Sequence, residues 1–111
     1  MTDQAKKQNL GKAPVFQGVF QYFPRALKAV AGVSGFGREK YKAEWTTKGW
    51  RDVPADDLRD ALARHQLDRC IEGDVNHTDG GLLHDAQVAW EALAVLEVRL
   101  IESERSAAKE K

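Results

Sequence analysis

Apolar side chains recur at spacings of three and four residues over three stretches of the chain, which is the period of an amphipathic α-helix. The first stretch follows Pro24, a residue that suits the first turn of a helix. Its apolar positions are Phe23, Ala26, Leu27, Val30 and Val33. The glycine-rich segment GVSGFG then predicts a kink or a break in this helix, after which helical spacing resumes with Tyr41 and Trp45.

The second stretch predicts a helix with clear boundaries. Pro54 comes at its start, and Asp56 and Asp57 lie in its first turn, where carboxylates interact favourably with the helix dipole. The helix runs to about Glu72, and Gly73 ends it.

The third stretch predicts the longest helix. After the turn-rich segment EGDVNHTDGG, the helix begins near Gly81 and runs to about Arg105. It is apolar around much of its circumference, which is typical of a helix that is buried centrally or lies in a subunit interface.

These elements predict an all-α fold, a small bundle of three to four helices that is oligomeric through its apolar C-terminal helix. No convincing strand is present. The polar residues 1–13 are expected to form a disordered N-terminal arm, residues 14–105 a single helical domain and residues 106–111 a frayed tail.

Composition narrows the classes of function. The 17 basic and 17 acidic side chains cancel, so nucleic-acid binding is disfavoured. The N-terminus lacks the apolar core of a signal peptide and no apolar run is long enough to span a bilayer, so we expect a cytoplasmic protein without a membrane partner. The single cysteine, Cys70, excludes an internal disulfide and is interpreted as a buried or half-buried thiol.

One face of the second predicted helix carries side chains that suit a divalent metal. His65, Asp68 and Glu72 lie at positions i, i+3 and i+7, which places them on the same side of a helix. An imidazole and carboxylates there offer lone pairs at fixed angles. The alternative is a solvated face with i,i+4 ion pairs.

The segment HTDGGLLHDA offers a second set of polar side chains before the last helix. Asp79 either caps that helix or contributes to a site, and Gly80 and Gly81 allow a tight backbone. His84 and Asp85 resemble the HD pair of metal phosphohydrolases, but no aspartate follows Asp85 to complete that motif.

A third set suits a nucleotide. Lys40 could bind a phosphate, and Tyr41 with Trp45 and Trp50 could stack on a base. The alternative places the aromatic side chains in the core and Lys40 on the surface.

The order of these residues resembles the N-terminal domain of phage dATP/dGTP diphosphohydrolases, small all-helical domains found beside or within MazG-like nucleotide pyrophosphohydrolases. The resemblance covers roughly residues 22–98. It rests on Phe23 and Pro24; Gly37, Lys40 and Tyr41; Trp45; Arg64 and His65; Glu72, Gly73 and Asp74; Gly81, Leu82 and His84; and Trp90. The sequence has Gln87 where the pattern often carries a second histidine, and it lacks the paired ExxE and ExxD motifs of a full MazG-like active site.

The resemblance implies a Mg²⁺- or Mn²⁺-dependent cleavage of a purine deoxynucleoside triphosphate to its monophosphate and pyrophosphate. It implies a metal site of His65, Glu72, Asp74 and Asp79. The implied catalytic residues are His65, Glu72, Asp79 and His84. Lys40 and Arg64 would balance phosphate charge, and Tyr41 or Trp45 would stack on the base.

Two partners follow from this interpretation, a deoxynucleoside triphosphate and further copies of the chain. A phage-encoded enzyme would act in the host cytoplasm. The alternative function is a non-catalytic phage module that binds a host protein or a nucleotide, which the small size and the incomplete acid set favour. A metal requirement would distinguish the enzyme from the binding module.

Overall fold

The computed structural model describes residues 11–46 and 49–110. Its elements are, in chain order, the π-helix η1 (Phe16–Phe20), α2 (Pro24–Lys40), the 3₁₀-helix η2 (Gly49–Asp52), α3 (Ala55–Glu72), β1 (Val75–Asn76), β2 (Leu82–Leu83) and α4 (His84–Glu110). The predicted all-α fold is therefore confirmed, apart from one very small sheet.

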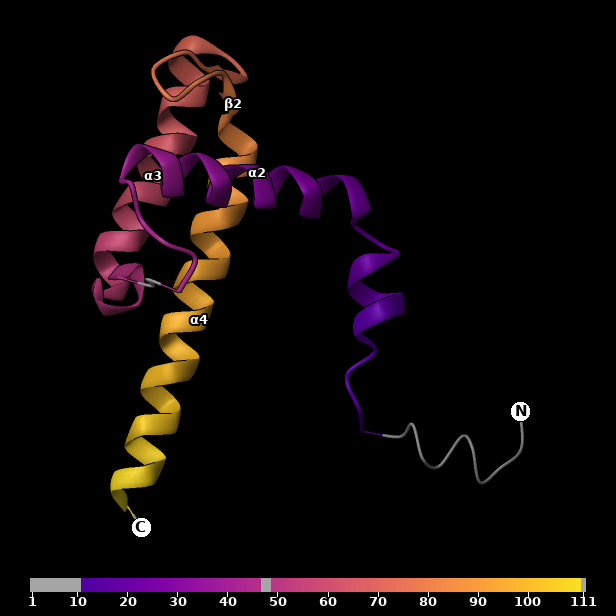
Figure 1. The fold of residues 1–111 in the computed structure, drawn as a ribbon, viewed down its shortest axis with the longest axis vertical. Helices are drawn as coiled ribbons and strands as arrows, with labels where there is room; N and C mark the ends of the chain where they lie inside the picture. The colour runs from indigo at the N-terminus through magenta and orange to yellow at the C-terminus, as the bar shows by residue number, and fades with distance from the viewer. Residues whose placement is uncertain (1–10, 47–48, 111) are drawn as a thin grey trace.

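The centre of the fold is an antiparallel pair of helices, α3 and α4 (Figure 1). Gly73 adopts a positive φ of 95° directly after α3, which releases the chain from the helix. The antiparallel strands β1 and β2 then connect the two helices, with Val75 opposite Leu83 and Asn76 opposite Leu82. This hairpin holds the start of α4 beside the end of α3.

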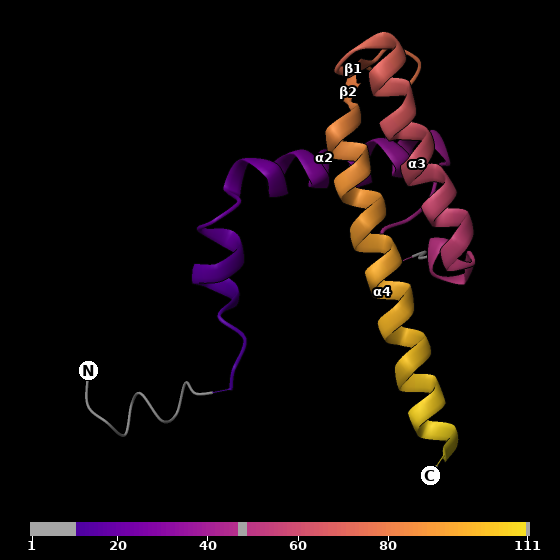
Figure 2. The ribbon, with the colours of Figure 1, turned by 180° about the vertical axis from the view of Figure 1, so that it is seen from behind.

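Helix α2 crosses the α3–α4 pair, and η1 projects away from it (Figures 1 and 2). Pro24 is the first residue of α2, as predicted. The glycines of GVSGFG do not break α2, which runs continuously through them and is supported by contact with α4. The helix ends at Lys40, so Tyr41 and Trp45 lie in the following connection rather than on a resumed helix.

The apolar core lies between α3, α4 and η2. Leu58 of α3 packs with Ala94 and Val98 of α4, and partly buried side chains surround them. Those are Trp50, Val53, Ala55, Trp90 and Val95. The core is small because α4 directs only some of its apolar positions at α3, while Leu93, Leu96 and Leu100 stay exposed.

Several boundaries differ from the sequence prediction. The turn-rich segment forms the β1–β2 hairpin, and α4 accordingly begins at His84 instead of Gly81. At its other end α4 continues past Arg105 to Glu110, because Ala107 and Ala108 have high helix propensity. The prediction that Cys70 is buried or half-buried is wrong. Its side chain is exposed, since its position on α3 faces away from α4.

Of the predicted disordered arm, residues 1–10 lie outside the described part of the chain, as does residue 111 of the predicted tail. Among the helices that the structure does describe, none combines the length and the apolar character needed to cross a bilayer.

Candidate functional site

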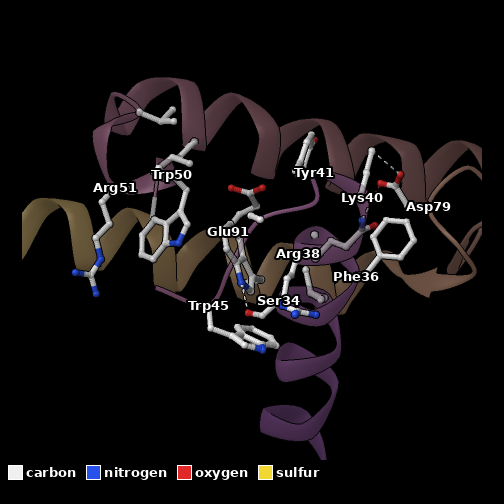
Figure 3. A pocket seen from close by; sticks show the side chains of 18 of the residues that line it. Ser34, Phe36, Arg38, Lys40, Tyr41, Trp45, Trp50, Arg51, Asp79 and Glu91 are labelled. Atoms are coloured by element: carbon white, nitrogen blue, oxygen red, sulfur yellow. Dashed lines mark hydrogen bonds and ion pairs between the residues drawn. The ribbon is translucent and has the colours of Figure 1, made fainter. Parts of the chain in front are cut away.

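A pocket of about 730 Å³ lies where α2 and the connection after it face the α3–α4 pair. Its wall combines side chains from α2, η2, α3, the β1–β2 turn and α4 (Figure 3). All three tryptophans of the chain, Trp45, Trp50 and Trp90, line it. A volume of this size suits a ligand as large as a nucleotide.

Each of three cationic side chains lies over an aromatic ring at this pocket. The Arg38 guanidinium carbon is 5.2 Å from the centroid of the Trp45 ring. Arg51 lies 5.6 Å from the Trp50 ring centroid. The Lys40 Nζ atom lies 5.6 Å from the Tyr41 ring centroid. The pocket wall therefore presents positive charge beside flat apolar surface.

Lys40 is joined to Asp79 of the hairpin turn. Its ammonium group donates to Asp79 Oδ1 at 3.1 Å, and Gln87 Nε2 donates to Asp79 Oδ2 at 3.0 Å. The hydrogen bond to Asp79 raises the pKa of Lys40. Burial alone would raise the pKa of Asp79, but the hydrogen bonds from Lys40 and Gln87 and the Lys40 charge lower it overall. Asp79 is thus a charged anchor between α2 and the hairpin.

Asn76 fixes the turn that carries Asp79. Its Oδ1 atom accepts hydrogen bonds from the backbone N–H groups of Thr78 and Asp79, at 3.1 and 3.2 Å. Its Nδ2 atom donates to Gln87 Oε1 at 2.9 Å. Asp79 therefore does not cap the last helix; its carboxylate points at α2 and α4 instead.

Two histidines lie at the floor of this region. His84, the first residue of α4, is fully buried, and its Nε2 atom contacts the Glu72 carboxylate of α3. The His65 ring of α3 is 5.9 Å from the His84 ring, between centroids. Burial lowers the pKa of His65, the His84 charge lowers it further, and the Asp79 charge partly opposes both. His65 is consequently a neutral imidazole at pH 7.

Four polar atoms in the pocket wall are buried and have no hydrogen-bond partner among the residues that the structure describes. They are Arg38 Nε, Arg51 Nε, His65 Nδ1 and Glu91 Oε2. Leaving such an atom unpaired costs roughly 1–3 kcal/mol, so a ligand that pairs with it gains affinity.

The structure brings most of the predicted site residues to one region. His65, Asp79, Lys40, Tyr41 and Trp45 all line the pocket. Glu72 and His84 form a pair behind His65, with His84 buried.

Two predicted site residues lie elsewhere. Asp74 is exposed and pairs with Arg69, which also pairs with Asp85. Arg64 is exposed and is not part of the pocket wall, although its charge acts on Glu91 and His65.

The predicted metal ligands do not gather into one centre. Within residues 11–46 and 49–110, no group of three or more His, Cys, Asp or Glu side chains is arranged to hold a metal ion. Asp79 pairs with Lys40, Glu72 pairs with His84, and Asp74 pairs with Arg69. These donor groups by themselves do not fit a resident divalent cation.

Sequence reasoning missed Arg38, Arg51 and Glu91 as pocket residues. Arg38 and Lys40 lie two residues apart at the end of a helix, a spacing that normally separates side chains. Glu91 follows Trp90 in a helix whose apolar pattern dominates. The run of cation and aromatic residues from Arg38 to Arg51 was the available signal.

The family model of the dATP/dGTP diphosphohydrolase N-terminal domain matches residues 2–108. The chain therefore belongs to the dATP/dGTP diphosphohydrolase N-terminal family, as the sequence resemblance indicated. No curated protein and no solved structure matched it.

Proposed function

We propose that this domain binds a purine deoxynucleoside triphosphate in the pocket between α2 and the α3–α4 pair, for hydrolysis to the monophosphate and pyrophosphate. The family name supplies the substrate class. The observation that carries the proposal is the pocket wall, in which arginine, histidine and glutamate atoms are buried without partners beside three tryptophans.

The aromatic side chains support binding of the base. Trp45 is 61% exposed and Tyr41 is 74% exposed, so much of each side chain remains accessible to a ligand in the pocket. Trp50 and Trp90 are fixed more firmly, because their rings pack edge to face at 5.6 Å between centroids. Stacking of a base on an aromatic ring is worth about 1–3 kcal/mol.

The cationic side chains support binding of the phosphates. Arg38 and Arg51 form no ion pair with any acid in the described ranges, so each guanidinium keeps its donors available. Lys40 already balances Asp79. Arginine suits phosphate because its planar fork donates two parallel hydrogen bonds. The two arginines are therefore assigned to the triphosphate.

His65 is the group in this wall best suited to promote hydrolysis. A neutral imidazole accepts a proton from water, and Nδ1 of His65 has no partner. The water oxygen bonds to phosphorus, the link between the α- and β-phosphates breaks, and pyrophosphate leaves. His84 and Glu72 lie behind His65, where they hold that side of α3 against α4.

Magnesium enters this proposal with the substrate rather than as a resident ion. Mg²⁺ in phosphoryl-transfer sites is commonly bound by one or two carboxylates together with substrate phosphates. Because the described side chains do not form a metal centre, no step assigned to them passes through one.

The test is release of pyrophosphate and of phosphate from each of the four deoxynucleoside triphosphates, with Mg²⁺, Mn²⁺ and EDTA in parallel. We expect metal-dependent pyrophosphate release from dATP and dGTP, lost in His65→Ala while far-ultraviolet circular dichroism stays unchanged. Phosphate release without pyrophosphate would contradict the assigned bond cleavage.

A second candidate is a nucleotide-binding domain that does not hydrolyse its ligand. The arrangement of the predicted metal ligands favours it, because Asp79, Asp74 and Glu72 are paired with cations or histidine instead of converging. No hydrolysis of any of the four nucleotides, combined with measurable binding of dATP or dGTP by the same folded protein, would support the non-hydrolysing binding domain.

A further inference from the structure

Some polar side chains at the inner wall of the pocket already form hydrogen bonds within the protein, and others do not. Trp90 Nε1 donates to Ser34 Oγ at 2.8 Å, and this bond fixes the indole in place. Gln87 is held by both Asn76 and Asp79. Glu91, one residue after Trp90 on α4, has a buried Oε2 atom for which residues 11–46 and 49–110 provide no hydrogen-bond partner.

The position of Glu91 places it among the aromatic side chains. In Figure 3 its carboxylate projects between Trp50 and Tyr41, above the Trp45 ring. A base that stacks on these rings would bring its hydrogen-bonding edge to the inner wall, where Glu91 lies.

The two purines present different edges to such a group. The Watson–Crick edge of guanine carries two adjacent donors, N1–H and N2–H, which match the two acceptor oxygens of a carboxylate. The same edge of adenine carries the N6–H donor beside the N1 acceptor. A protonated carboxyl group matches it, because one oxygen accepts while the other donates.

Building on the proposed function, we propose that Glu91 reads the base, accepting from guanine N1–H and N2–H as a carboxylate and pairing with adenine N6–H and N1 as a carboxylic acid. One side chain then serves both purines of the family's substrate pair. Thymine offers a single N–H flanked by two carbonyl oxygens, so the carboxylate pairs with it only once, whereas the carboxylic acid pairs with it twice, as it does with adenine.

The surroundings of Glu91 favour its uncharged form more than water does. Burial raises the pKa of Glu91, and the positive charge of Arg64 on α3 partly offsets that increase. The other titratable or charged side chains of the pocket come from α2, the following connection, η2, α3 and the hairpin turn. They are Arg38, Lys40, Tyr41, Glu44, Arg51, His65 and Asp79.

The test measures dissociation constants for dGTP, dATP and dTTP, with Mg²⁺, by equilibrium dialysis of the full chain between pH 5.5 and 8.5. The readout is the ratio of dATP to dGTP constants, because protonation of the triphosphate affects both nucleotides equally. The variant is Glu91→Gln. Its matched control is Glu44→Gln, which removes the charge of an exposed acid at the same pocket.

In the wild type we expect preference to shift toward dGTP as pH rises and toward dATP as it falls, with dTTP following the pH dependence of dATP. A glutamine amide has one donor and one acceptor, so it pairs twice with adenine, at N6–H and N1, and also twice with guanine, at N1–H and O6. Glu91→Gln should therefore lose the dGTP preference that the wild type shows at high pH, by about tenfold or more, and its ratio should not change with pH. Glu44→Gln should keep the wild-type pattern.

A pH-independent ratio in the wild type overturns the role of Glu91, and that result stands even if Glu91→Gln fails to fold. An unchanged ratio in folded Glu91→Gln overturns it as well. Absence of binding by every nucleotide to the wild type is a different result, which refutes the proposed function itself.

Discussion

At the scale of single residues, the candidate site depends on side chains that the tertiary fold leaves without partners. For His65, the surroundings change the protonation of the imidazole ring. Its neighbours on α3 are exposed, but its own ring lies against His84 and the pocket, so burial favours the uncharged form. That form is the one able to accept a proton.

The pH dependence of hydrolysis tests this role of His65. Its folded-state pKa is below 6.5, so His65 stays neutral at pH values where an exposed histidine would be half charged. We expect kcat/KM for pyrophosphate release to fall on the acid side with a midpoint below pH 6.5. A midpoint above pH 6.5 would contradict the assignment. A kcat/KM that does not fall at all on the acid side would contradict it as well.

At the scale of elements, the β1–β2 hairpin positions Asp79 and His84, and sequence reasoning did not find it. Each strand has two residues, too few to show an alternating pattern. The predicted α3 has nearly the observed bounds, because Pro54, the first-turn aspartates and Gly73 act locally. The partners of Asp79 depend on how α2 crosses the α3–α4 pair, which local sequence patterns do not predict.

Gly80 joins the hairpin to α2, and its replacement tests that contact. A Cβ atom there would lie 2.7 Å from Phe36 Cε2, whereas one at Gly81 would meet nothing within 4 Å. Both glycines have positive φ, so alanine at either position costs about 1–2 kcal/mol of backbone strain.

Gly80→Ala should therefore destabilise the protein by roughly 1 kcal/mol more than Gly81→Ala, because the Phe36 ring must also move. Urea denaturation of both variants measures the difference. Equal losses of unfolding free energy would mean that the hairpin does not depend on packing against Phe36.

At the scale of the whole molecule, the described part of the chain leaves many large apolar side chains exposed and buries few. Only Leu58, Ala86, Ala94 and Val98 are buried hydrophobic side chains among residues 11–46 and 49–109. The radius of gyration is 17.5 Å, against about 13 Å for a compact domain of this length. This shape supports the proposal that further copies of the chain cover part of α4.

The exposed leucines of α4 provide the test of assembly. Leu93, Leu96 and Leu100 are each at least 50% exposed and lie on one side of the helix. We expect a homo-oligomer in sedimentation equilibrium that dissociates in Leu96→Glu. Ser106→Glu adds the same charge at an exposed polar position of α4 and should leave assembly intact. A monomeric wild type would refute the proposal.

The most direct test of the central claim, that the pocket binds the nucleotide, is a ¹H–¹⁵N spectrum recorded while dGTP is added to the full chain. We expect the indole signals of Trp45, Trp50 and Trp90 and the Nε–H signals of Arg38 and Arg51 to shift and saturate together. The Nε–H signal of Arg99, far along α4, should stay in place. Saturable shifts confined to other residues, or no shift at millimolar dGTP, would contradict the account.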